Sequence, residues 1–149
     1  KSQIELKFSS VGANSTETFT MVGDPASIVI ADTYLKGIQD FDVQKAYVAM
    51  LKSANQIENN PLRPDLQDYI EKGFVTTKTE GSVSITQEYN LADYSIALLA
   101  NELGKKEDYK RFLNRSISYQ KLFDNNFKIR KFYVLYSRKK KSIFRWYKK

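Results

Sequence analysis

Cysteine and histidine are both absent from this sequence of 149 residues. Without cysteine, the chain has no disulfide framework and no thiolate chemistry. Without histidine, it lacks the commonest general base and the commonest zinc ligand. Acid–base chemistry would therefore depend on aspartate, glutamate, lysine or tyrosine side chains.

Long apolar runs are also absent, since no stretch of 18 consecutive apolar residues occurs. We therefore predict no membrane span. Residues 1–10 are basic but contain no apolar core of the kind that secretory signals need, so we predict no signal peptide in this chain. The first residue is lysine and not an initiator methionine, and we expect the sequence to begin inside a longer gene product. The hydrophobic content of 42% is sufficient for one packed domain.

The net charge of +7 is concentrated at one end of the chain. Residues 125–149 carry ten lysines and arginines and no acid, whereas residues 1–124 carry 14 basic and 17 acidic residues. Seven of the 20 aromatic residues also lie in this C-terminal tail, which has no glycine or proline. One interpretation is a tail that binds nucleic acid or an anionic membrane surface. The other is an out-of-frame translation, because the tail shows no steady period of 2 or 3.6 residues.

Residues 24–55 have the pattern of a helical hairpin. Asp24 can cap the first helix, Pro25 fits its first turn, and Gly37 suits its C-terminal exit. Asp42 can cap the second helix, whose apolar positions recur at helical spacing. The link between the two helices is short, so we expect them to be antiparallel neighbours.

A short helix, an extended segment and two longer helices follow. We predict these segments over 64–72, 74–83, 84–103 and 106–123, in that order. Ser84 is the predicted N-cap of the longest helix, and Gly104 ends it. This helix also carries apolar side chains away from its main face, at Leu91, Tyr94 and Leu98. A helix that is apolar on more than one side is usually packed against neighbours on both sides, which indicates that further helices are missing from this chain.

Three motifs occur in order along residues 14–124. The first lies between Thr16 and Asp42, where Met-x-Gly is followed by Val-Ile-Ala-Asp-x-Tyr-x-Lys-Gly-Ile. The second contains Gly73-Phe74-Val75, Ser82-Val83-Ser84, Glu88-Tyr89 and Asp93. The third contains Leu103-Gly104-Lys105, Tyr109 and Leu122-Phe123-Asp124. Together these motifs resemble glycoside hydrolase family 92.

The resemblance implies exo-acting α-mannosidases that use a bound Ca²⁺, invert the anomeric configuration and act on mannose-containing glycans, many at α-1,2 linkages. It also implies a β-sandwich followed by an (α/α)6 barrel, and a periplasmic or secreted location. We therefore expect an all-α fold in which residues 1–124 form helical hairpins of part of such a barrel. An irregular basic tail at 125–149 would follow. The expected partners are the missing remainder of the barrel and the β-sandwich domain.

Inverting glycosidases use two carboxyl groups roughly 6.5–9.5 Å apart, one as acid and one as base. The resemblance implies a Thr-Glu-x-Asn-x-Trp-Gln-Tyr motif for the acid and a later Gly-rich, Asp-rich motif for the base, and this sequence contains neither. We therefore expect no catalytic residue, no metal ligand, no bound Ca²⁺, no nucleic-acid partner and no mannosidase activity from this chain alone. Two alternatives remain: a small helical module that binds nucleic acid or anionic membrane through its tail, and an independently folded all-α protein.

Two acids flank the turn at residues 21–23 and are the candidate substrate contacts. Glu17 and Asp24 could border the sugar subsite, since the resemblance implies that loops at one end of the barrel form the cleft. The alternatives are that Asp24 only caps its helix and that Glu17 is a solvated loop acid.

Three other acids have structural interpretations. Glu88 and Asp93 lie about 140° apart around one predicted helix, so they do not face one site together. We expect a solvated or structural role for both. We expect Asp32 to be a partly buried hydrogen-bond acceptor or to pair with Lys36 one turn later.

Overall fold

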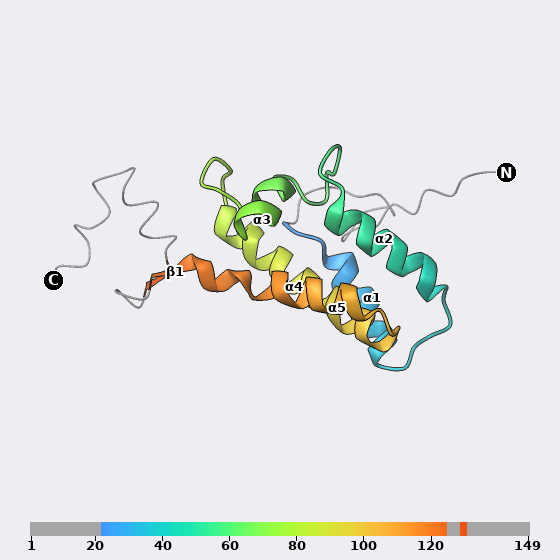
Figure 1. The fold of residues 1–149 in the computed structure, drawn as a ribbon. Helices are drawn as coiled ribbons and strands as arrows, with labels where there is room; N and C mark the ends of the chain where they lie inside the picture. Colours follow the sequence, from blue (N-terminus) through green and yellow to red (C-terminus); the bar gives the residue numbers. More distant parts are fainter. Residues whose placement is uncertain (1–21, 125–128, 131–149) are drawn as a thin grey trace, which may run out of the picture.

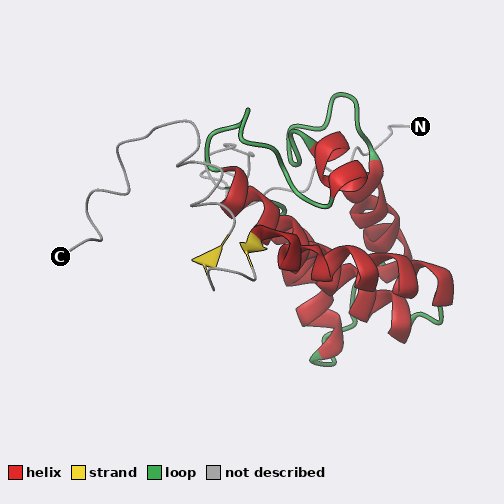
Figure 2. Ribbon diagram, turned by 60° about the vertical axis from the view of Figure 1, so that its left-hand side comes forward, coloured by secondary structure: helices red, strands yellow, loops and turns green. Residues whose placement is uncertain are grey.

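The computed structural model describes residues 22–124 and 129–130, and this part of the chain is mainly helical (Figure 1). In chain order its elements are α1 (Pro25–Leu35), α2 (Val43–Asn55), α3 (Leu66–Lys72), α4 (Ser82–Glu102), α5 (Lys106–Ser116), the 3₁₀ helix η2 (Ile117–Leu122), and the strands β1 (Phe123–Asp124) and β2 (Ile129–Arg130). The two strands form a small antiparallel pair beside the helices (Figure 2). The predicted all-α class is confirmed. Glu17 and most of the predicted tail lie outside the described residues.

Both predicted caps of the first hairpin are confirmed. The carboxylate of Asp24 accepts a hydrogen bond from the backbone N–H of Ser27 at 3.3 Å. The carboxylate of Asp42 accepts one from the backbone N–H of Lys45 at 3.0 Å. Each bond satisfies a donor that has no partner inside the first turn of its helix. Pro25 occupies the start of α1, where a backbone N–H is not needed.

The start of α4 differs from the prediction. The helix begins at Ser82, not at Ser84. Gly81 makes the earlier start possible because it adopts a left-handed backbone conformation with φ of 70°, which glycine tolerates without steric cost. Its carbonyl then accepts the N–H of Ile85 at 3.0 Å, which closes the first turn.

The segment around α3 differs as well. α3 begins at Leu66, not at Pro64, because Asp65 lies in a left-handed turn conformation with φ of 58°. The predicted extended segment over 74–83 consists largely of turns, and its last two residues belong to α4. The backbone N–H of Thr79 donates to the carbonyl of Thr76 at 3.2 Å, which closes one of these turns.

The last predicted helix, over 106–123, changes type part-way along. α5 ends at Ser116 and is followed by the tighter η2 and then by β1. The side chain of Asn90 explains the change, because its oxygen accepts the N–H of Tyr119 at 2.6 Å. Its nitrogen donates to the hydroxyl of Ser118 at 3.0 Å. These bonds from α4 replace part of the regular α-helical pattern.

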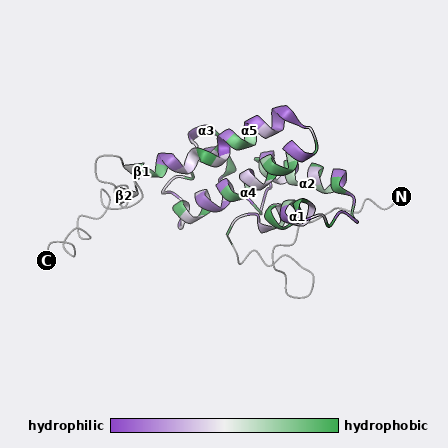
Figure 3. Ribbon diagram, turned by 90° about the horizontal axis from the view of Figure 1, so that it is seen from below, coloured by the Kyte–Doolittle hydropathy of each residue, from purple (hydrophilic) through white to green (hydrophobic). Residues whose placement is uncertain are grey.

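α4 is the central element of the described fold. α5 packs along one of its sides and α1 along another, and Figure 3 shows α4 between them. The main core joins α1, α2, α4 and α5 through Ala31, Tyr47, Met50, Ala54, Ile96, Ala97, Leu99, Ala100 and Phe112. Its alanines allow the helix axes to approach closely. A second cluster around α3 consists of Leu66, Tyr69, Val75, Ile85 and Tyr89.

The helices differ in how their apolar side chains are distributed. α5 is strongly amphipathic, and its outer face is hydrophilic (Figure 3). α1 carries apolar side chains on more than one side: Val29 is 62% exposed, whereas Ala31 on the same helix is buried. Such a helix is typical of a position with neighbours on both sides. This distribution agrees with the expectation that further helices belong beside this chain.

Candidate functional site

Four charged side chains form one network at the centre of the described helices. They are Asp24 at the start of α1, Arg63 in the loop before α3, Asp93 on α4 and Arg115 on α5. Asp24, Arg63 and Asp93 are almost completely buried. Two acids balance two bases, so the network as a whole is neutral.

Arg63 bridges the two acids. Its Nη1 donates to Oδ1 of Asp93 at 2.7 Å, while its Nη2 and Nε donate to Oδ2 of Asp24 at 3.1 and 3.3 Å. Arg115 adds a bidentate pair, in which Nε and Nη2 donate to the two oxygens of Asp93 at 2.7 and 3.0 Å. Paired contacts of this kind are strong, directional and specific to arginine.

Neutral groups complete the hydrogen bonding of both carboxylates. The hydroxyls of Ser27 and Ser53 each donate to Oδ2 of Asp24 at 2.8 Å. The hydroxyl of Tyr69 donates to Oδ2 of Asp93 at 3.0 Å. Within the described residues, every buried side-chain nitrogen or oxygen has a hydrogen-bond partner. Charges remain buried only when they are paired and hydrogen-bonded, and this network meets both conditions.

The surroundings also determine the protonation of three side chains. Burial alone would lower the pKa of Arg63, but the charges of Asp93 and Asp24 outweigh this effect and hold that pKa above its ordinary value. Burial raises the pKa of Tyr69, and the charge of Asp93 raises it further. Burial likewise raises the pKa of Tyr89. Arg63 therefore stays cationic and both phenols stay neutral near neutral pH, so none of them serves as a general base.

The structure places Asp24 inside the protein. Its bond to the N–H of Ser27 confirms the predicted capping role, and its carboxylate also faces Arg63. The contact with Arg63 was not predicted, because the two residues are 39 positions apart and nothing local in the sequence links them. A role of Asp24 in substrate binding stays a prediction, and Glu17 lies outside the described residues.

The other acids have structural surroundings. Asp93 has the structural role predicted for it and lies at the centre of the network. Asp32 pairs with Lys36 at 2.7 Å, as one alternative predicted. The prediction that Asp32 is partly buried is wrong: it is exposed, since no described element covers its side of α1.

Glu88 is half-buried on α4, where the chain before α1 crosses it. A Cβ atom added to Gly23 would lie only 2.6 Å from the Cβ of Glu88, so the backbone of Gly23 lies directly against this side chain. The contact brings the start of α1 beside the first turns of α4.

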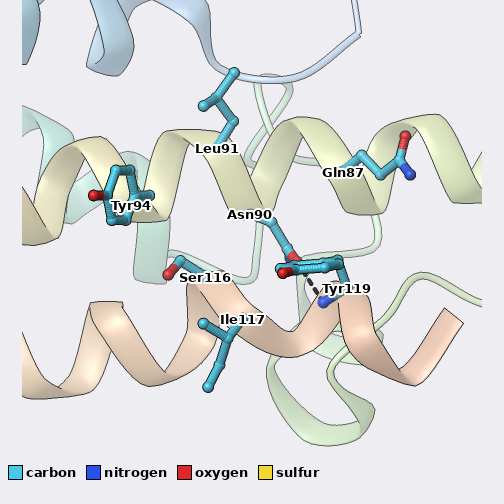
Figure 4. A pocket seen from close by; sticks show the side chains of 7 residues that line it. All are labelled: Gln87, Asn90, Leu91, Tyr94, Ser116, Ile117 and Tyr119. Carbon is cyan, nitrogen blue, oxygen red and sulfur yellow. Dashed lines mark hydrogen bonds between the residues drawn. The ribbon is translucent and has the colours of Figure 1, made fainter. Parts of the chain in front are cut away.

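A groove lies between α4 and η2 (Figure 4). It is open, has a volume of about 380 Å³, and is lined by Gln87, Asn90, Leu91, Tyr94, Ser116, Ile117 and Tyr119. None of these side chains is charged. Figure 4 shows the hydrogen bond from the backbone of Tyr119 to Asn90, which joins the two walls of the groove.

The described residues do not fit a calcium ion. In this part of the chain, no three acidic, histidine or cysteine side chains come together in a way that could hold a metal. Ca²⁺ takes six to eight oxygen ligands, whereas the carboxylates of Asp24 and Asp93 already bind guanidinium groups. The same ion pairs make both acids unsuitable as the proton donor or base of an inverting glycosidase.

Comparison with known proteins reveals the family. The model of the glycosyl hydrolase family 92 catalytic domain matches residues 3–149. The chain belongs to glycoside hydrolase family 92. The predicted family resemblance is confirmed, and the match extends beyond residues 14–124, the range over which the resemblance was predicted.

Relatives in family 92 are much longer than this chain. An uncharacterized secreted glycosidase from Arthroderma benhamiae is 32% identical in an alignment 121 positions long that covers 70% of this chain and 15% of that protein. A family 92 α-mannosidase from Bacteroides thetaiotaomicron, solved in complex with mannoimidazole, is 43% identical with a TM-score of 0.69. The likeness covers 76% of this chain and 14% of that one.

A second family 92 structure from Bacteroides thetaiotaomicron, an inverting mannosidase, shares the fold with a TM-score of 0.73 at 24% identity. This likeness covers 79% of this chain and 17% of that one. The two structures confirm the predicted fold class, helical hairpins that form part of the (α/α)6 barrel of the family. In the described part of the chain, no helix combines the length and apolar character that a bilayer crossing requires.

Proposed function

We propose that this chain is a structural segment of the catalytic domain of an exo-acting α-mannosidase, which removes mannose from glycans with inversion. The observation that carries the proposal is the 43% identity to an α-mannosidase solved with mannoimidazole. Ca²⁺, the catalytic acid and the catalytic base then belong to parts of the complete enzyme outside this chain. A periplasmic or secreted location is proposed for that enzyme as well.

The buried network supports a scaffolding role for the described helices. Asp24, Arg63, Asp93 and Arg115 connect α1, the loop before α3, α4 and α5. The four charged groups are paired with one another and so do not act on the substrate. Their contribution to catalysis is to hold these elements in fixed relative positions. Glu17 and the turn that precedes Asp24 would then border the sugar, held in place by the cap of α1.

The inactivity of the isolated chain is directly testable. The purified chain is incubated with Ca²⁺ and an α-mannoside that the Bacteroides thetaiotaomicron α-mannosidase, the positive control, hydrolyses under the same conditions. We expect no release of mannose above the buffer blank, because an inverting reaction needs two free carboxyl groups on opposite faces of the sugar. Saturable turnover by the chain alone would contradict the proposal.

The alternative of a nucleic-acid-binding module depends on residues 125–149, most of which lie outside the described residues. DNA binding with a steep salt dependence, lost when residues 126–149 are removed, would support that alternative. The out-of-frame origin of the tail also stays a prediction. The nucleotide sequence around codon 125 tests it: a downstream frame that lacks the two carboxylate motifs would rule it out.

A further inference from the structure

We infer that Glu88 is a substrate contact of the complete enzyme, and that its carboxylate accepts hydrogen bonds from hydroxyl groups of a mannose unit bound at the end of the fold where α1 and α4 begin. The inference rests on the proposed function, because it takes an α-mannoside as the substrate. It adds a residue of α4 to the proposed border of the sugar, which otherwise consists of Glu17 and the turn that precedes Asp24.

α1 and α4 begin at the same end of the described fold. The backbone of Gly23, just before α1, lies against Glu88 in the first two turns of α4. Further along, Ala31 of α1 belongs to the same core cluster as Ile96 and Ala100 of α4. The two helices therefore run side by side in the same direction, and Glu88 lies near the end at which both begin.

The loops at this end are longer than those at the other end. They comprise residues 56–65 and 73–81, on either side of α3, and Arg63 ties the first of them to the start of α1. At the other end, residues 36–42 and 103–105 are enough to join the helices. Binding residues concentrate where long loops are held by a rigid scaffold, so the end that contains Glu88 is the better place for a sugar.

Glu88 differs from every other buried or half-buried acid whose side chain the structure describes. No hydrogen bond or ion pair within the described residues engages its carboxylate. Asp24 and Asp93 are paired in the buried network, and Asp68 and Asp108 also have partners. The other acids whose side chains have no partner in this part of the chain are all exposed: Asp40, Glu58, Glu80 and Glu102. A covered acid whose hydrogen bonding is left open is typical of a binding site.

The carboxylate of Glu88 is accessible to a ligand, although the rest of the side chain is partly covered. Among the described side chains, every nitrogen or oxygen that is fully buried has a hydrogen-bond partner, so the oxygens of Glu88 reach the surface. Gly23 keeps them open, because a Cβ at this position would lie 2.6 Å from the Cβ and 3.5 Å from Oε2 of Glu88. Glycine is typical of positions where the backbone closely approaches a ligand or another element.

The chemistry of one free carboxylate favours a sugar hydroxyl over other ligands. An ionised carboxylate repels anions such as phosphate. Ca²⁺ needs six to eight oxygen ligands, and among the described residues no three side chains form a metal-binding group around Glu88 or elsewhere. A hydroxyl donates a short, charge-assisted hydrogen bond to a carboxylate, and mannose presents several hydroxyls. A carboxylate that makes such bonds also discriminates strongly against a sugar that lacks the contacted hydroxyl.

Replacing the matching segment of the Bacteroides thetaiotaomicron α-mannosidase with the aligned residues of this chain gives a swapped enzyme that tests the inference. Glu88→Gln keeps the shape of the side chain and removes its charge. We expect it to weaken mannoimidazole binding, or to lower kcat/KM for an α-mannoside that the host hydrolyses, by roughly 10-fold or more, with Tm unchanged. Glu102→Gln, at an exposed acid near the other end of α4, is the matched control and should change none of these values.

A series of monodeoxy α-mannosides, each lacking one hydroxyl, locates the contact. The substrate that lacks the contacted hydroxyl should be cleaved with about equal kcat/KM by the unsubstituted swap and by Glu88→Gln, because neither pair can form the bond. A loss of mannoimidazole affinity assigns the contact to the mannose that this inhibitor mimics. A loss confined to kcat/KM for the α-mannoside assigns it to the neighbouring sugar. A smaller graft of residues 82–102 alone keeps the test available if the larger swap does not fold.

Four outcomes would overturn the inference. If Glu88→Gln binds mannoimidazole and cleaves the α-mannoside like the unsubstituted swap, the carboxylate makes no contact with the sugar. If the substitution lowers Tm by more than about 5 °C, the role of Glu88 is structural. If every monodeoxy substrate retains the full effect, Glu88 acts through another residue. If excess Ca²⁺ restores the lost activity, Glu88 is a metal ligand.

Failure of the proposed function has a different signature. An unsubstituted swap that folds cooperatively but neither binds mannoimidazole nor cleaves the α-mannoside would contradict the proposed function, and the inference would fall with it. An active swap that is insensitive to Glu88→Gln would contradict the inference alone.

Discussion

At the scale of single residues, Arg63 has the largest structural effect. Its guanidinium group is fully buried and bridges the carboxylates of Asp24 and Asp93. A buried ion pair of this kind contributes little net stability compared with a well-packed apolar core, but removal of one partner leaves an uncompensated charge. Arg63 therefore determines the relative arrangement of the elements that carry Asp24 and Asp93 more than it adds to the net stability of the fold.

Arg63→Met should destabilise the full chain by about 3–5 kcal/mol, because two buried carboxylates lose their shared partner. Urea unfolding followed by circular dichroism measures the change. Lys36→Met is the matched control, since it breaks the exposed pair with Asp32 and should change stability by less than about 1 kcal/mol. Equal effects of the two substitutions would show that the buried network does not organise the fold.

Tyr69→Phe should destabilise the chain by about 1–3 kcal/mol, because the hydroxyl that Asp93 and Asn90 contact is lost inside the protein. Tyr94→Phe removes a hydroxyl from an exposed ring and should have little effect. Urea midpoints of both variants and the parent chain decide between these outcomes. A Tyr69→Phe variant as stable as the parent would contradict the role assigned to this hydroxyl.

The raised pKa values of Tyr69 and Tyr89 predict sensitivity to alkali. An unfolded tyrosine titrates near pH 10, whereas the folded state keeps these two phenols protonated to higher pH. Their contribution is therefore complete below about pH 10 and is lost as the pH rises further. We expect the urea midpoint to fall above about pH 10, and to fall less in Tyr69→Phe; an equal fall in both proteins would refute this assignment.

At the scale of elements, features that depend on nearby residues could be predicted from the sequence, whereas features that depend on distant residues could not. The caps at Asp24 and Asp42 were predictable because each depends on a donor only three residues away. The change from α5 to η2 was not, because Asn90 bonds to the backbone of Tyr119, 29 residues later. The same distinction applies to the site, where the cap was predicted and the pairing with Arg63 was missed.

Gly23 and Gly37 have similar backbone conformations but different surroundings, so a comparison of alanine substitutions at the two positions distinguishes backbone strain from steric crowding. Gly23 and Gly37 have φ of 94° and 88°, so an alanine at either is strained. Only at Gly23 would the new Cβ meet a neighbour, the Cβ of Glu88 at 2.6 Å. Gly23→Ala should therefore cost about 1–3 kcal/mol more than Gly37→Ala in urea unfolding. Equal costs would show that α1 and α4 can separate at this contact.

At the scale of the whole molecule, the described helices have a well-packed, charge-paired centre, whereas their outer faces leave apolar side chains exposed. The centre has paired charges and a contiguous core, whereas apolar side chains such as Val29 and Leu91 remain about half exposed or more. The chain spans only 14–17% of solved relatives that share its fold. Together these features describe a segment of a larger catalytic domain whose missing helices would cover the open flanks.

Replacing the matching segment of the Bacteroides thetaiotaomicron α-mannosidase with the aligned residues of this chain, and measuring mannose release by the swapped enzyme, tests this view most directly. In the presence of Ca²⁺, we expect a swap that melts in one cooperative transition to release mannose from an α-mannoside that the unswapped host hydrolyses, because the grafted helices supply the scaffold and the host supplies the chemistry. A swap that folds cooperatively and releases no mannose would show that these helices cannot serve in an α-mannosidase.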